Sequence, residues 1–153
     1  MDPLFLDQLE RLLDSVERHV RSQAPRPNAD QKLLSILTRL VYEIIPSDPE
    51  RVEFRQGQTL GPHRKHWFRA KFGNGRFRLF FRYRTDARII VYSWVNDSQS
   101  LRTYGSRTDA YAVFGRMLDS GDPPEDWDSL LERAASQENL ARAHEMTARL
   151  KKP

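Results

Sequence analysis

The sequence predicts an α+β fold in which a small antiparallel β-sheet packs on an N-terminal antiparallel helix pair and is followed by C-terminal helices. Three observations support this fold class. Residues 67–83 alternate between apolar and cationic side chains around an Asn-Gly pair, a pattern typical of a β-hairpin. Two segments within residues 3–45 have the apolar spacing of amphipathic helices. A further apolar run, about 88–96, follows the hairpin as another strand.

The predicted helix pair occupies residues 3–45. Asp2 and Pro3 suit the N-cap and the first turn of a helix over about 3–23, and the segment Pro25-Arg26-Pro27 ends it. Asn28 is a suitable cap for a second helix, over about 29–45, which ends before the segment 46–49 with its two prolines. Because each helix has one apolar stripe, the two are expected to pack against each other and cover the sheet.

The hairpin is the element that the sequence specifies most closely. A two-residue turn at Asn74-Gly75 would pair Gly73 with Arg76. The register that follows joins three apolar pairs, namely Phe72 with Phe77, Ala70 with Leu79, and Phe68 with Phe81. Slipping the pairing by one residue would mix the apolar and cationic faces, so the register is well specified.

The second face of the hairpin is cationic and is expected to face solvent. It gathers Arg69, Lys71, Arg76, Arg78 and Arg82, with Trp67 and Phe80 among them. Like charges side by side on a sheet are destabilising. A chain that concentrates them on one face is therefore expected to bind an anion there. Trp67 and Trp94 are interpreted as core residues rather than as platforms for stacked bases.

The remaining segments complete a single predicted domain, residues 1–153, with the helix pair 3–45, a basic sheet region 50–96 and a C-terminal helical part 107–150. Residues 50–66 are predicted to be irregular and basic. The strand at about 88–96 is apolar on both faces, as a central strand would be. Helices are expected over about 109–119, where Thr108-Asp109 is a suitable cap, and from about 127 to 150, starting at Asp126. The last has few leucines among many polar residues, so we expect it to be partly mobile or dependent on a partner.

Charge is distributed unevenly along the chain, although the net charge is only +4. Residues 51–116 contain 14 Lys and Arg against four Asp and Glu, whereas the flanking segments have an excess of acidic residues. A basic block of this kind favours a polyanionic partner such as nucleic acid. The alternative is a solvated surface with scattered arginines.

Composition excludes several kinds of chemistry. The chain has no cysteine, which rules out disulfides, cysteine nucleophiles and thiolate metal sites, and fits a cytoplasmic location. No long apolar run predicts a membrane span. The four carboxylates of the basic block are scattered along the sequence, so neither a bound metal nor another cofactor is expected. They are Glu53, Asp86, Asp97 and Asp109.

Five motifs together resemble the YhaV toxin family, the toxin half of PrlF–YhaV type II toxin–antitoxin pairs. They are KFGNGRFRLFFRY at 71–83, WVND at 94–97, LRTYG at 101–105, TDAY at 108–111 and PPEDW at 123–127. The resemblance extends from about residue 3 to residue 130. More loosely, the segments 69–71 and 77–79 resemble the catalytic strands of RelE-like ribonucleases. Those toxins usually begin with a strand before the helix pair, so the number of strands is left open.

The resemblance implies a RelE-like fold and an endoribonuclease that cleaves mRNA, in association with the ribosome, and so inhibits translation and growth. It also implies a cognate PrlF-like antitoxin with a swapped-hairpin DNA-binding domain. Toxin and antitoxin would form a hetero-oligomer, and promoter DNA would be bound only through that complex. We expect an acidic antitoxin segment to cover the cationic face.

Metal-independent RNA cleavage needs a base for the 2′-hydroxyl, a cation for the developing phosphorane charge and an acid for the leaving oxygen. Arg78 is predicted to stabilise the charge, because guanidinium binds phosphate through two donors. Lys71, opposite Arg78 in the predicted register, is the candidate base. Arg69 and Arg82 would orient the RNA backbone. Tyr104 and Tyr111 match family positions where a tyrosine acts as an acid or stacks on a base, although Tyr111 fits the core of the 109–119 helix equally well.

Further basic residues complete the predicted RNA-binding set, which is Arg64, Lys65, Arg76, Arg102 and Arg107. His63 and His66 form a possible acid/base pair, since histidine titrates near neutral pH. Taken singly, each is better interpreted as a solvated loop residue. Two histidines without a third ligand are a weak metal site.

Two other functions remain open from the sequence. The same cationic face would also suit a non-catalytic module that binds RNA or the ribosome. A toxin that acts on another protein could be built on the same fold. Only the set of Lys71, Arg78 and the two tyrosines favours the ribonuclease over the first alternative, whereas the cationic face itself argues against the second.

Overall fold

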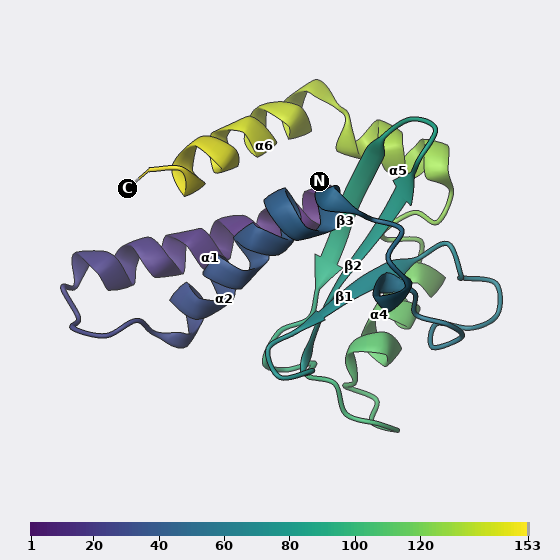
Figure 1. Ribbon diagram of the computed structural model, residues 1–153, viewed down its shortest axis with the longest axis horizontal. Coiled ribbons are helices and arrows are strands. Elements are labelled where there is room, and N and C mark those ends of the chain that lie inside the picture. Colours follow the sequence, from purple (N-terminus) through teal and green to yellow (C-terminus); the bar gives the residue numbers. More distant parts are fainter. Residues whose placement is uncertain (153) are drawn as a thin grey trace.

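The computed structural model describes residues 1–152 and has a mixed α+β fold built on a three-stranded antiparallel sheet. The strands follow one another in the order β1-β2-β3, with β1 Phe68–Phe72, β2 Phe77–Arg84 and β3 Ile89–Val95. Five helices surround the sheet, namely α1 Pro3–Arg21, α2 Ala29–Arg39, α4 Ala110–Asp119, α5 Trp127–Ala134 and α6 Gln137–Leu150. Figure 1 shows α1 and α2 on one side of the sheet and α4 and α5 on the other.

The helix pair begins at the predicted caps. The Asp2 side chain accepts a hydrogen bond from the Leu4 amide at 2.9 Å, and Asn28 forms a reciprocal capping box with Gln31. The second helix continues beyond α2 through a π-helical turn, η1 Leu40–Ile44, and the short α3, Ile45–Ser47. This helical run ends two residues beyond the predicted position of about 45. A 3-10 turn, η2 Val52–Phe54, follows in the loop before β1.

The hairpin forms in the predicted register. Phe72 lies opposite Phe77, Ala70 opposite Leu79 and Phe68 opposite Phe81. At the tip the Arg76 amide donates to the Gly73 carbonyl at 3.2 Å, and Asn74 and Gly75 have φ values of 57° and 77°. A type I′ turn requires positive φ at both central residues, which is why Asn-Gly sits there.

The prediction that the strand at 88–96 is central is wrong, because β2 lies in the middle and β3 at the edge. The free edge of β3 is instead covered by α1. The Gln8 side-chain amide donates to the Val95 carbonyl at 2.6 Å and accepts from the Val95 amide at 3.1 Å, and the Asp2 amide donates to the Tyr92 carbonyl at 2.8 Å. These contacts block further strand pairing at an otherwise open edge.

The single helix predicted from 127 to 150 is also wrong, since the chain breaks into α5 and α6 at Ala135 and Ser136. The C-terminal helix α6 also packs against the rest of the protein. Helix α6 runs beside α1 (Figure 1), buries Met146 and pairs Arg142 with Asp7 at 2.6 Å. Arg149 likewise pairs with Asp14 and Glu17. Few leucines are needed because arginines on α6 meet the acidic side chains of α1.

Both faces of the sheet are covered, which corrects the expectation that the cationic face of the hairpin lies open to solvent. One core cluster lies between the sheet and helices α1, α2 and α6. A second fills the opposite face, where Trp67, Phe80 and Trp94 pack with Phe114 of α4 and Leu130 of α5. Trp67 and Trp94 are core residues, as expected. Arg69 and Arg78 are therefore carried into the protein interior and Arg82 is half-buried, whereas Arg76 stays on the surface.

Candidate active site

The cationic face meets α4 at a buried cluster of two arginines and a tyrosine. Nε of Arg69, on β1, donates to the Tyr111 hydroxyl at 2.8 Å, and Nε of Arg78, on β2, donates to the same oxygen at 3.1 Å. The three residues are only 8%, 5% and 6% exposed, respectively. Tyr111 is thus both a core residue of α4 and the acceptor that holds two guanidinium groups together, so the two interpretations of this residue are compatible.

Arg78 is fixed at the hairpin tip by its other hydrogen bonds. Its Nη1 donates to the Gly75 carbonyl at 2.7 Å and to the Phe77 carbonyl at 3.0 Å. Its backbone amide donates to Oδ1 of Asn96 at 2.6 Å. Within residues 1–152, Nη2 of Arg78 has no hydrogen-bond partner. The expectation that Arg78 points freely into solvent is therefore wrong, and only the outer edge of its guanidinium is open to a ligand.

Arg69 is anchored in a similar way. Its Nη1 donates to the Glu53 carbonyl in η2, so the irregular segment before β1 helps to orient this arginine. The opposite guanidinium edge joins the Tyr111 hydroxyl. Both arginines are held by neutral acceptors and by no carboxylate of the described chain, so their positive charges remain uncompensated. That combination of fixed geometry and unneutralised charge suits the binding of a phosphate.

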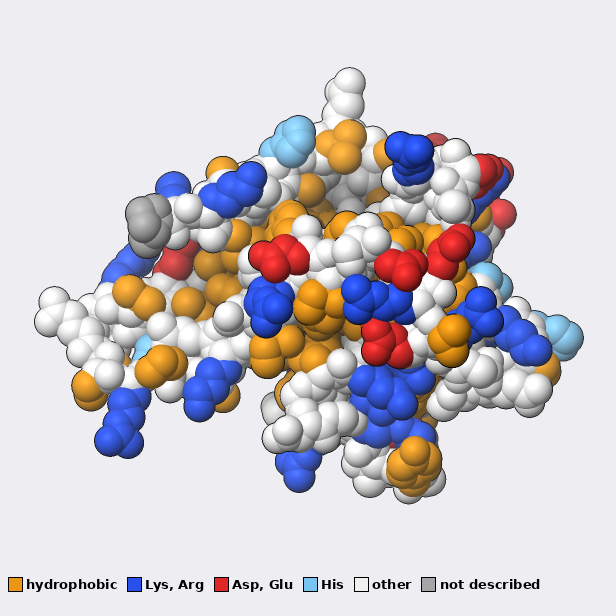
Figure 2. All heavy atoms as spheres, viewed as in Figure 1, with side chains coloured by type: hydrophobic (Ala, Val, Ile, Leu, Met, Phe, Trp, Pro, Cys, Tyr) orange, Lys and Arg blue, Asp and Glu red, His pale blue; other side chains and the backbone are white. Residues whose placement is uncertain are grey.

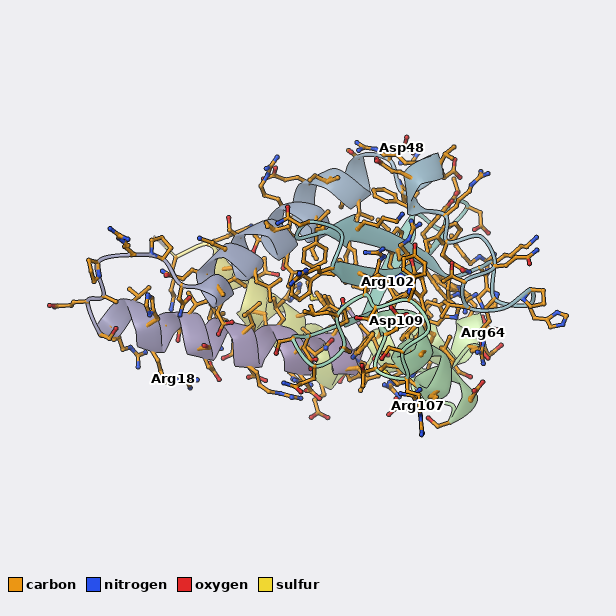
Figure 3. All side chains as sticks on the ribbon, turned by 90° about the horizontal axis from the view of Figure 1, so that it is seen from below. Arg18, Asp48, Arg64, Arg102, Arg107 and Asp109 are labelled. Atoms are coloured by element: carbon orange, nitrogen blue, oxygen red, sulfur yellow. The ribbon has the colours of Figure 1, made fainter. Side chains whose placement is uncertain are left out.

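The loop between β3 and α4 forms the next wall of the cluster. The Arg102 guanidinium lies 3.7 Å from the centre of the Tyr104 ring and 4.8 Å from that of the Tyr111 ring. Tyr104 itself is 86% exposed. Asp109 caps α4 and binds Nη1 of Arg102 at 2.6 Å, and the two side chains point toward each other in Figure 3.

Exposed cations surround this cluster. Lys71 lies directly opposite Arg78 across the hairpin, and Arg76 follows the turn. Both are exposed, and neither side chain makes a hydrogen bond or ion pair with the described part of the chain. Figure 2 shows basic side chains gathered between the sheet and the loop at the lower end of the view. These cations are available to the backbone of a nucleic acid.

Other predicted site residues lie in a separate group beside α5. Arg64 pairs with Asp119 at 2.7 Å and with Glu125 at 2.8 Å. Arg82 lies between the rings of Trp67 and Trp127 and donates to the Glu125 carbonyl. Figure 3 places Arg64 well apart from Arg102. The structure therefore does not bring Arg64 or Arg82 to the Tyr111 cluster.

Three more candidates are on surface segments. Lys65 and His63 are exposed in the loop before β1, and Arg107 is exposed before α4, apart from Arg102 in Figure 3. His66 is half-buried, and burial lowers its pKa, with the positive charge of Arg82 adding to the effect. Its imidazole is neutral at neutral pH, so it is poorly suited to donate a proton as a general acid.

Sequence reasoning missed two residues that shape the cluster. Asn96 joins the Arg78 amide, the Arg76 carbonyl and the Ser100 carbonyl through its side chain. Asp109 was interpreted only as a helix cap. Both occur within the motifs at 94–97 and 108–111, but a helix cap and a loop asparagine are common in any fold. The contact of Asn96 with Arg78 and that of Asp109 with Arg102 follow from the tertiary structure alone.

The arrangement can hold a phosphate beside a tyrosine hydroxyl, with an exposed lysine and an exposed aromatic ring at its margin. Within residues 1–152, no three His, Asp or Glu side chains are grouped so that they could ligate a metal ion. No helix among these residues is long and apolar enough to cross a membrane.

Comparison with known proteins gives a consistent result. Residues 1–135 match the model of a family described as a toxin with endonuclease activity, of a toxin–antitoxin system, and called YhaV. The chain is 42% identical over 132 residues to the ribonuclease toxin YhaV of Escherichia coli K12, covering 84% of this chain and 85% of that protein. The same values hold for the toxin YhaV of Escherichia coli O6:H1, strain CFT073. No solved structure matches the chain.

Proposed function

The chain belongs to the YhaV family and is a ribonuclease toxin of a toxin–antitoxin system, and we propose that it inhibits translation and growth by cleaving mRNA at the ribosome without a metal ion. The observation that carries the proposal is the meeting of Arg69 and Arg78 on the Tyr111 hydroxyl, beside the exposed Lys71. Two fixed, uncompensated guanidinium groups are suited to a phosphate whose charge increases in the transition state.

In the proposed reaction the scissile phosphate lies at the outer edge of this pair. Arg78 donates through Nη2, which has no partner in residues 1–152, and Arg69 supports the same charge. Lys71, in its neutral amine form, accepts the proton of the attacking 2′-hydroxyl and becomes the ammonium. The Tyr111 oxygen accepts a hydrogen bond from each arginine. Its hydroxyl proton is therefore free to be donated to the leaving 5′-oxygen.

The RNA chain is proposed to run along the exposed side of the hairpin tip and the loop 101–105. Arg76 and Lys71 contact phosphates, and the open face of the Tyr104 ring stacks on a base. Lys65 and Arg107 are more distant basic residues that would meet a longer substrate. Arg64, Arg82 and the two histidines are not assigned to the reaction, because Arg64 is paired with carboxylates and Arg82 packs between tryptophans.

Ribosome association is tested by comparing naked mRNA with the same mRNA under translation, using purified toxin and physiological magnesium in both reactions. We expect cleavage within the coding region of translated mRNA and at least a tenfold lower rate on the naked transcript, since positioning by the ribosome replaces binding energy that the small site lacks. A translation inhibitor that clears ribosomes from the message is the control. Equal cleavage of naked and translated mRNA would remove the ribosome from the proposal.

The antitoxin is proposed to be a PrlF-like protein whose acidic segment covers the exposed cations of the site. We expect its association rate with the toxin to fall as salt rises, because steering between opposite charges is screened. Replacing either Lys71 or Arg76 singly by Glu should slow association, whereas Arg26→Glu, an equal charge change in the turn after α1, should not. The test is stopped-flow binding of the co-encoded antitoxin. An association rate that changes neither with salt nor with the charge reversals at Lys71 and Arg76 would instead indicate an allosteric block.

A further inference from the structure

We infer that Asp109 is a positioning residue of the ribonuclease site, which acts through Arg102 to hold Tyr104 and Tyr111 in place for the RNA. The inference rests on the proposed site and adds to it a residue that touches no substrate. Asp109 is only 4% exposed, yet it binds three groups from two different segments. Its partners are Nη1 of Arg102, the Thr103 amide and the Tyr111 amide.

Asp109 does more than cap a helix, as does Asp2, which also pairs with Arg133 at 3.0 Å. Asn28, Asp126 and Ser136 each bind groups within three residues of themselves in the sequence. Asp109 meets the same need with Oδ2, which accepts from the Tyr111 amide at 3.0 Å. Its Oδ1 turns back to the preceding loop and accepts from Arg102 and Thr103, both at 2.6 Å. A capping role alone explains the contact of Oδ2 with the Tyr111 amide. It does not explain the two contacts of Oδ1 with Arg102 and Thr103.

The ion pair between Asp109 and Arg102 is mostly buried, with side chains 5% and 13% exposed. Buried ion pairs add little net stability because both charges lose their water, so they are weak evidence of a purely stabilising role. We interpret this ion pair as a contact that orients the Arg102 side chain. The pair fixes the Arg102 guanidinium over the Tyr104 ring and close to the Tyr111 ring.

The loop is held from its other side by the hairpin. The Arg102 amide donates to the Arg76 carbonyl at 3.0 Å, and Nδ2 of Asn96 donates to the same carbonyl at 3.0 Å. Arg102 therefore connects the hairpin tip, which carries Arg78, to the start of α4, which carries Tyr111. Without the carboxylate, its guanidinium would lose the one charged partner it has within residues 1–152. The Tyr104 ring would then lose the cation that packs on it, and the Tyr111 ring would keep only the more distant Arg78, at 5.7 Å.

The test compares Asp109→Asn with Asp126→Asn. Asparagine is as good a helix cap as aspartate, so both variants should keep the fold, and Asp126→Asn should melt close to the wild type. Asp109→Asn leaves the buried charge of Arg102 without its partner, so its melting temperature should be lower, and its kinetics are measured at a temperature where both variants are folded. Only Asp109→Asn removes the charge that pairs with Arg102. We expect it to lower kcat for mRNA cleavage on the order of 10²-fold with a KM within about threefold, since misplacement of reacting groups costs rate more than binding. Asp126→Asn should leave both values unchanged.

Two further readouts separate this inference from the proposed reaction itself. The Nε–H proton of Arg102 should show an upfield NMR shift from the Tyr104 ring in the wild type and in Asp126→Asn, and lose it in Asp109→Asn. In addition, the double variant Arg102→Gln/Asp109→Asn should be no slower than Arg102→Gln alone. Wild-type kcat in Asp109→Asn, or additive losses in the double variant, would overturn the inference. An unchanged Arg102 shift in Asp109→Asn would overturn it whether or not the proposed reaction is correct.

Discussion

Replacing Arg78 by alanine is expected to abolish growth inhibition and to lower the rate of RNA cleavage on the order of 10²–10³-fold, the usual effect of removing one charge-stabilising donor. The guanidinium joins the hairpin carbonyls of Gly75 and Phe77 to the Tyr111 hydroxyl, and its Nη2 is the proposed phosphate donor. The measurement is single-turnover cleavage of mRNA in a translation reaction, together with growth of cells that express the variant.

Because Arg78 is buried, loss of activity must be separated from loss of the fold. Arg78→Lys keeps a positive charge but cannot bind Tyr111 and the hairpin carbonyls together, so it should be folded and still strongly impaired. Arg76→Ala, two residues away and exposed, is the matched control and should weaken RNA binding only modestly. A folded Arg78→Ala protein that cleaves at the wild-type rate would refute the assignment of Arg78.

The second large effect is expected for Tyr111→Phe, which removes a single oxygen. That oxygen accepts from Arg69 and Arg78, and its proton is the proposed acid, so cleavage should slow about 10²-fold or more. Leaving two buried N–H groups without their acceptor should also lower the free energy of unfolding, by roughly 1–3 kcal/mol for each group. Single-turnover kinetics and urea denaturation measure the two effects separately.

Tyr104→Phe makes the same chemical change at an exposed ring and serves as the control. It keeps the surface that packs on Arg102, so stacking on a base should persist and the rate should change less than about threefold. If Tyr104→Phe proved slower than Tyr111→Phe, the acid would have to be assigned to the exposed tyrosine instead.

Local sequence signals predicted the elements that depend on local chemistry. The Asn74-Gly75 turn and the alternation beside it determined the hairpin register, and Asp2, Asn28 and Asp109 marked helix starts correctly. Each of these relations joins residues close together in the chain. The break before α6 was missed because Ala135 and Ser136 are compatible with an uninterrupted helix, and only the cap at Ser136 shows the new start.

The candidate site depends on contacts that local patterns do not contain. Arg69 and Arg78 meet Tyr111, which lies 42 and 33 positions further along the chain. The interleaving of arginines with Trp67 and Phe80 suggested a solvent-facing cationic surface, because a half-buried sheet was assumed. In the structure α4 and α5 cover the aromatic part of that face. Arg69 and Arg78 are tolerated there because backbone carbonyls and the Tyr111 hydroxyl accept hydrogen bonds from Nε and Nη1 of each guanidinium.

The central claim is that these residues cleave RNA by attack of the 2′-hydroxyl without a metal ion, and the chemistry of the new RNA ends tests it most directly. Fragments produced by purified toxin from translated mRNA are isolated, and both termini are identified by enzymatic end-labelling and mass spectrometry. Attack by the 2′-hydroxyl would leave a 2′,3′-cyclic phosphate or 3′-phosphate on the upstream fragment and a 5′-hydroxyl on the downstream fragment, and these are the expected ends. A 3′-hydroxyl paired with a 5′-phosphate would contradict it, because that pair of ends results from attack by water.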